Sequence, residues 1–156
     1  LPASGPARTE VFNWLMWQMG SAPFLGGGFG HFYTYAPEKY EYPINRYAME
    51  TKRQLDVLDR RLADRPFVAG DEYSIADMAI WPWYGGTVLG RQYGDAATFL
   101  SAHEYEYVMA WAEKIDARPA TKRGRMVNRT SGEPHEQLRE RHGPEDFETK
   151  TQDKIG

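Results

Sequence analysis

The stretch from Val68 to Trp83 constrains the fold more than any other part of the chain. Ser74 and Asp77 stand three residues apart, which is the spacing of a capping box. In a capping box the Ser74 hydroxyl accepts from the backbone N–H of Asp77, and the Asp77 carboxylate accepts from the N–H of Ser74. Between Ile75 and Trp83 only Asp77 is charged. The pattern therefore predicts a capped helix that is apolar all round and buried in the centre of the fold.

The spacing of apolar residues indicates that the other regular elements are helices as well. Gly20 is expected to end the first of them, and Pro43 suits the first turn of the next. No segment alternates as a strand does, so we predict an all-α fold of about five to six helices around the capped one. Helices are expected over residues 8–20, 43–64, 75–90 and 104–117.

Residues 21–42 are rich in glycine, proline and aromatic side chains. This composition predicts an irregular connection, and its length makes it a candidate functional loop. Its glycines would let a ligand approach the backbone, while aromatic side chains would form the walls of a substrate pocket. Packing at an interface is the alternative interpretation. The candidate pocket residues are Phe29, His31, Phe32 and Tyr33.

Composition limits the possible functions. The 156 residues suffice for one domain with a core, and the formal net charge of −3 does not favour nucleic-acid binding. The absence of cysteine excludes disulfides and a cysteine nucleophile. No apolar run is long enough for a membrane span, so a cytoplasmic protein is expected. His135 and His142 stand alone in a polar tail, and we predict no metal site.

Two further polar residues are candidates for ligand contacts. Gln18 falls on the same helical stripe as Val11, Trp14 and Leu15, so its amide would lose water. It either bonds to neighbouring backbone or contacts a ligand. Arg46 lies off the apolar stripe of its helix, and the pattern alone indicates a solvated arginine.

The motif over Val68–Ala79 (VAGDEYSIADMA) resembles the capping-box motif of the C-terminal helical domain of glutathione transferases. Within that family the chain resembles the bacterial nu-class, in the subgroup of disulfide-bond oxidoreductases. The resemblance covers residues from about 8 to 150. Four further stretches carry it: Asn13–Gln18 (NWLMWQ), Phe24–Phe32 (FLGGGFGHF), Ile44–Tyr47 (INRY) and Arg118–Ala120 (RPA).

The resemblance implies a domain organisation. Residues 1–7 would be the end of an interdomain linker, 8–120 the C-terminal α-helical domain and 121–156 a polar C-terminal extension. A thioredoxin-like N-terminal domain would precede the linker and is absent from this chain. We therefore expect a fragment with little or no activity alone.

The resemblance also implies a function. The parent protein would be a glutathione-dependent disulfide-bond reductase and a homodimer, with glutathione as cosubstrate and a small disulfide or an electrophile as substrate. Arg46 would bind a glutathione carboxylate and Gln18 would line the cleft, while no catalytic residue lies in this chain. The alternatives are a non-catalytic binding or scaffold module and a conventional glutathione-conjugating transferase.

Overall fold

The computed structural model describes residues 1–127 and 133–136. In this part of the chain the regular elements are helices, and Phe67 and Gly70 form an isolated β-bridge. The predicted all-α fold is thus confirmed. The elements are α1 (Gly5–Pro23), the π-helix η1 (Phe24–Tyr35), α2 (Glu41–Leu62), α3 (Ile75–Val88), α4 (Ala96–Phe99), η2 (Ala102–Glu104), α5 (Glu106–Asp116), α6 (Pro119–Gly124) and η3 (Pro134–Glu136).

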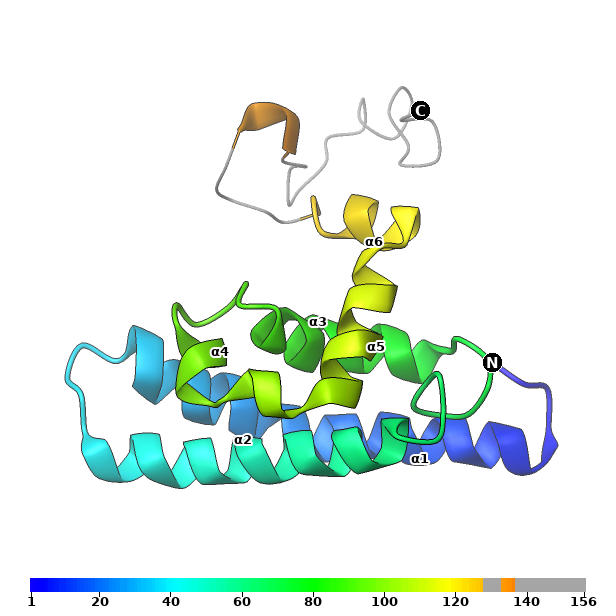
Figure 1. Ribbon diagram of the computed structural model, residues 1–156, viewed down its shortest axis with the longest axis horizontal. Coiled ribbons are helices and arrows are strands. Elements are labelled where there is room, and N and C mark those ends of the chain that lie inside the picture. The colour runs from blue at the N-terminus through cyan, green and yellow to red at the C-terminus, as the bar shows by residue number, and fades with distance from the viewer. Residues whose placement is uncertain (128–132, 137–156) are drawn as a thin grey trace, which may run out of the picture. The chain divides into compact units, whose positions relative to one another are not determined.

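The chain divides into two compact units, Leu1–Lys114 and Ile115–Gly156. In the first unit η1 packs against α2, and α1 packs against α3 (Figure 1). The second unit contains α6, and there Arg125 donates to Asp116 over 3.4 Å. Most of the predicted polar extension, including His142, lies outside the described residues.

The capping box forms as predicted at the start of α3. Ser74 is the N-cap; its hydroxyl accepts from the N–H of Ala76 at 3.2 Å and from the third helical residue. The Asp77 carboxylate accepts from the Ser74 N–H at 3.0 Å, and both side chains are buried. The other oxygen of Asp77 accepts from the Val68 N–H and from the Trp111 indole N–H, each at 3.0 Å. One carboxylate therefore joins the turn before α3, the start of α3, and α5.

The rest of α3 is buried on most of its surface but not on all of it. Ile80 and Tyr84 have no exposed surface, and the Trp81 indole donates to the Ala112 carbonyl of α5 at 3.0 Å. Met78 and Trp83 are 51% and 37% exposed. The prediction of burial on every face is wrong at these two positions and at Pro82, where the helix surface is left uncovered.

The helix α2 also fixes the start of α5. Asp59 accepts from the backbone N–H groups of Tyr107 and Val108 at 2.9 and 3.1 Å. These are donors that the first turn of a helix cannot satisfy internally. Tyr105, just before α5, has no side chain suited to that role. A residue 48 positions earlier in the chain supplies the cap instead.

The predicted irregular connection over residues 21–42 is wrong except at residues 36–40, which lie between two helices. The helix α1 continues through Gly20 to Pro23 and passes directly into η1, which extends to Tyr35. Helix α1 also begins at Gly5, inside the predicted linker. Glycine disfavours helix by about 1 kcal/mol relative to alanine. Packing against other segments outweighs that preference here.

Aromatic rings explain why η1 contains glycine. A Cβ atom on Gly28 would lie 2.4 Å from the Tyr47 ring, one on Gly30 would lie 2.4 Å from the Tyr93 ring, and one on Gly26 would lie 2.6 Å from Trp83. Three rings from α2, α3 and the turn after α3 thus rest on the bare backbone of η1. Gly27 differs, since a Cβ there would meet no atom within 4 Å.

Asp77→Ala should lower the free energy of unfolding by about 3 kcal/mol or more, because it removes bonds to a charged acceptor and leaves three buried N–H groups, of Val68, Ser74 and Trp111, without a partner. Urea denaturation measures this change. Asp71→Ala, at an exposed site in the same turn, should stay within about 0.5 kcal/mol of the parent. Equal effects of the two variants would contradict the central role of Asp77.

Gly28→Ala and Gly27→Ala should change stability in opposite directions. The new methyl at position 28 would displace the Tyr47 ring and cost about 1–3 kcal/mol. The methyl at position 27 meets open space and should stabilise the helix by up to about 1 kcal/mol. Thermal unfolding of the two variants checks this, and destabilisation by both would show that η1 does not tolerate any side chain there.

Candidate functional site

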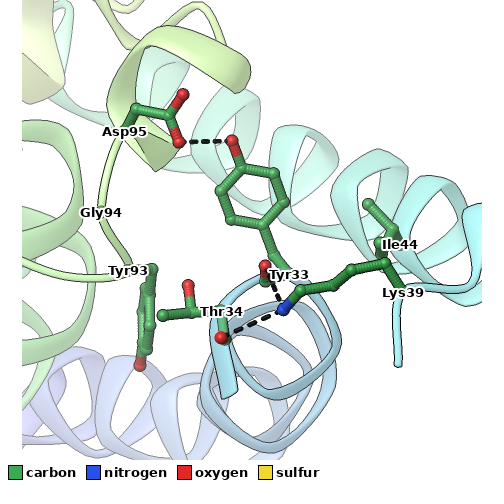
Figure 2. A pocket seen from close by; sticks show the side chains of 7 residues that line it. All are labelled: Tyr33, Thr34, Lys39, Ile44, Tyr93, Gly94 and Asp95. Carbon is green, nitrogen blue, oxygen red and sulfur yellow. Dashed lines mark hydrogen bonds between the residues drawn. The ribbon is translucent and has the colours of Figure 1, made fainter. Parts of the chain in front are cut away.

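An open pocket of about 440 Å³ lies where the end of η1 meets the turn before α4 (Figure 2). The turn brings polar groups to one rim, while Ile44 of α2 supplies an apolar side chain. The pocket is lined by Tyr33, Thr34, Lys39, Ile44, Tyr93, Gly94 and Asp95.

Tyr33 and Asp95 face each other across this pocket. The Tyr33 hydroxyl donates to Asp95 Oδ1 over 2.6 Å (Figure 2). Burial, the hydrogen bond to Asp95 and the charge of Asp95 together raise the pKa of Tyr33 to about 12. The phenol therefore stays protonated at neutral pH and acts as a hydrogen-bond donor.

Lys39 holds the end of η1. Its ammonium group donates to the carbonyl oxygens of Tyr33 and Thr34, each at 3.0 Å. A cation is favourable at a helix C-terminus, where carbonyl groups lack helical partners. Lys39 thus fixes the backbone that carries Tyr33.

The opposite rim is a tight turn. Tyr93 and Gly94 both have left-handed backbones, with φ of 59° and 65°. Such a conformation is uncommon for a tyrosine. Its ring rests on Gly30 and lies edge-on to Tyr35, with centroids 6.1 Å apart. This packing holds the turn and therefore places Asp95 opposite Tyr33.

The pocket combines an ammonium, a carboxylate, a phenol and a hydroxyl, which suits the binding of a polar ligand. It contains no thiol, and the chain has no cysteine. Among the described residues there is no group of three or more histidine, aspartate or glutamate side chains that could hold a metal ion. The pocket offers recognition groups rather than a nucleophile.

The structure places the four predicted pocket residues in different surroundings around η1. Tyr33 lines the pocket, but Phe29 is fully buried and stacks on Tyr33, with centroids 5.0 Å apart. Phe32 stacks on Tyr47 at 5.6 Å, and His31 is exposed with its ring edge against Phe32. Because η1 is helical, neighbouring residues point to different sides. A loop would not have separated them in this way.

Gln18 lies in the part of α1 that packs near α3, next to Trp17, whose ring contacts Tyr84 at 5.3 Å. Gln18 is 8% exposed, and its amide forms no hydrogen bond with the described residues. The hydrogen bond to neighbouring backbone, one of the two alternatives for Gln18, is therefore not found among the described residues. The side chain keeps its hydrogen-bonding capacity.

Arg46 is exposed on α2 and forms no hydrogen bond or ion pair with the described residues. The charge of Arg46 nevertheless affects the pKa of Glu50, which lies one helical turn later. The pKa of Glu50 is lowered chiefly by its hydrogen bond to Arg53, with smaller contributions from Gln54 and from the charge of Arg46. Arg46 is therefore a cation with all its donors available.

Lys39, Tyr93 and Asp95 were not predicted as site residues. The Gly94-Asp95 pair is an ordinary turn signal in the sequence. Nothing in the local pattern connects it to Tyr33, 62 residues earlier. The packing of Tyr93 on Gly30, and of the Phe99 ring against Tyr33 at 4.7 Å, brings the two segments together.

Comparison with known proteins identifies the fold family. Residues 42–114 match the family model for the glutathione S-transferase C-terminal domain. The chain is 64% identical to the disulfide-bond oxidoreductase YghU of Escherichia coli over 154 residues, which cover 99% of this chain and 53% of that protein. The chain spans about half the length of the curated relatives it matches.

Solved structures agree with this assignment. Glutathione transferase YghU from Streptococcus pneumoniae, complexed with glutathione, is 61% identical, with a TM-score of 0.78 over 80% of this chain and 48% of that one. A glutathione transferase from Burkholderia graminis, with two glutathione molecules bound per subunit, is 34% identical, with a TM-score of 0.75 over 84% of this chain and 54% of that one. The family model and the solved structures together identify residues 42–114 of this chain as a glutathione S-transferase C-terminal domain.

Proposed function

We propose that this chain is the C-terminal helical domain of a nu-class glutathione transferase that acts as a glutathione-dependent disulfide-bond reductase. The identity to a disulfide-bond oxidoreductase over nearly the whole chain supports this activity. The helical domain would form the substrate-side wall of the cleft. A thioredoxin-like domain of the same protein would form the other wall.

The single observation that carries the proposal is the state of Arg46. An exposed guanidinium without an ion pair in the described residues is ready to bind an anion. Its planar donors match a carboxylate in a bidentate manner. We assign it to a carboxylate of glutathione. Gln18, which keeps its donors and acceptor, is the second proposed glutathione contact.

The lack of cysteine in this chain agrees with a chemistry in which glutathione supplies the thiols. Two bound glutathione molecules would supply both thiols. The thiolate of the first attacks one sulfur of the substrate disulfide, which forms a mixed disulfide and expels the other sulfur as a thiolate that takes up a proton. The second glutathione thiolate attacks the glutathione sulfur of the mixed disulfide, which yields glutathione disulfide and the second substrate thiol. The helical domain orients the reactants and contributes no reacting group.

The pocket beside Tyr33 is our proposed contact for the polar end of the disulfide substrate. While the Tyr33 hydroxyl donates to Asp95, its oxygen can accept from a substrate donor, and the Asp95 carboxylate can accept from a substrate ammonium. Phe29 below Tyr33 and Phe32 beside Tyr47 would support this wall from the interior. His31 is exposed and would reach the substrate only from the outer side.

Association with partners is supported by α1. Phe12, Met16 and Met19 follow helical spacing and are 38%, 62% and 65% exposed. Contact with the thioredoxin-like domain and with a second copy in a homodimer would cover such a stripe. No described helix is long and apolar enough to cross a membrane. We propose the cytoplasm as the location, because glutathione is kept reduced there.

Arg46→Ala in the full-length protein should raise the KM for glutathione about 10-fold or more in the reduction of hydroxyethyl disulfide. The loss of hydrogen bonds between charged groups, about 1.5–3 kcal/mol, predicts this change. Arg60→Ala is the matched control, since Arg60 is an exposed arginine of α2 that pairs with Asp56. Absence of disulfide turnover in the parent protein would refute the reductase.

Tyr33→Phe should lower kcat/KM for the disulfide several-fold and leave the KM for glutathione unchanged, because it removes only the phenolic hydroxyl and its bond to Asp95. Steady-state kinetics with each substrate varied in turn measures both values. Tyr35→Phe, at a 67% exposed position on the same helix, is the control and should behave like the parent. If Tyr33→Phe instead raised the KM for glutathione, the pocket would contact glutathione, and its assignment to the disulfide substrate would be wrong.

A further inference from the structure

We propose that Arg53 is a positioning residue that keeps Arg46 available for glutathione by holding the carboxylate of Glu50. The inference rests on the proposed function, in which Arg46 binds a glutathione carboxylate. It concerns residues that would not touch the ligand. The side chains that carry it are Arg46, Glu50, Arg53, Gln54 and Tyr84.

The spacing on α2 creates a competition between two arginines. Arg46 stands four residues before Glu50, and Arg53 stands three residues after it. Residues three and four apart lie next to each other on a helix surface. The single carboxylate of Glu50 is thus within reach of a cation on either side. If it paired with Arg46, the donors of that guanidinium would be occupied before a ligand arrived.

In the structure Glu50 pairs with Arg53 and not with Arg46. Arg53 binds Glu50 with two hydrogen bonds, of 2.6 Å from an outer nitrogen to Oε1 and 2.9 Å from Nε to Oε2. A bidentate pair of this kind is strong and fixes the carboxylate plane. Arg46 forms no such bond. Both oxygens of Glu50 are therefore turned toward Arg53.

A buried chain of polar groups holds Glu50 in this orientation. The Gln54 amide donates to Glu50 Oε1 at 2.9 Å, and the Tyr84 hydroxyl donates to the Gln54 oxygen at 2.9 Å. Gln54 and Tyr84 have no exposed surface. Burial and the charge of Glu50 raise the pKa of Tyr84, so its hydroxyl remains a donor. The carboxylate is held from the core as well as from the surface.

The surroundings of Glu50 favour this role over that of an ordinary surface ion pair. The Glu50 side chain is 14% exposed, whereas that of Arg53 is 58% exposed. A pair that only stabilised α2 would have no effect on a ligand. A positioning pair predicts a change in glutathione binding when Arg53 is lost, and recovery when Glu50 loses its charge.

The test is a mutant cycle in the full-length protein, measured as the KM and kcat for glutathione in hydroxyethyl disulfide reduction and as the Kd for glutathione by calorimetry. Arg53→Ala should raise the KM and Kd about two- to fivefold with kcat unchanged, because Glu50 then pairs with Arg46. The double variant Arg53→Ala/Glu50→Gln should return both values to those of the parent. Arg60→Ala removes an equal charge from α2 and should change neither.

Each outcome has a distinct meaning. If Arg46→Ala weakens glutathione binding but Arg53→Ala does not, the proposed function stands and the positioning role of Arg53 is overturned. If Arg53→Ala weakens binding and the double variant does not recover it, Arg53 acts by another route and the inference fails. If Arg46→Ala itself leaves binding unchanged, the assigned role of Arg46 fails and the inference fails with it. The thermal midpoint of each variant separates these effects from unfolding.

Discussion

The carboxylate of Asp77 is the interaction on which the fold depends most. It has no exposed surface and accepts hydrogen bonds from Ser74, Val68 and Trp111. Burying a charge is costly unless hydrogen bonds compensate for it, and here each oxygen accepts two. Because its donors come from three separate segments, the charge is compensated only when α3, the preceding turn and α5 are in place together. The carboxylate therefore selects one arrangement of these segments.

The packing of aromatic rings against glycine backbone is the second interaction that holds the fold together. Tyr47, Trp83 and Tyr93 lie against Gly28, Gly26 and Gly30. Each ring approaches η1 more closely than any side chain would permit. The contact of the Tyr93 ring with Gly30 also shapes the candidate pocket, because it fixes the turn that places Asp95 beside Tyr33.

The sequence predicts well what is decided by neighbouring residues. The capping box of Ser74 and Asp77 depends on a spacing of three and is found as expected. The helical class and the approximate limits of α2, α3 and α5 follow from periodicity in the same way. The partners of Asp77 on Val68 and Trp111 were not predictable, since they depend on how distant segments pack.

The prediction fails where distant contacts overrule local preference. Glycine usually interrupts helices, so the glycine-rich segment is predicted to be a loop. In the structure the segment is the helix η1, and aromatic rings from elsewhere in the chain pack against its glycines. The candidate site shows the same division. Tyr33 lines a pocket of the structure, whereas Phe29 is fully buried beneath it. Asp95 could not be found, because only the folded chain brings it to Tyr33.

The cap of α5 by Asp59 has a consequence for the order of folding. An isolated segment of 11 residues is too short to be a stable helix in water. The donors at its start are satisfied by a side chain of α2, so this helix gains its cap only after the two segments meet. We infer that α2 serves as a template, and that α5 becomes helical as it docks rather than before.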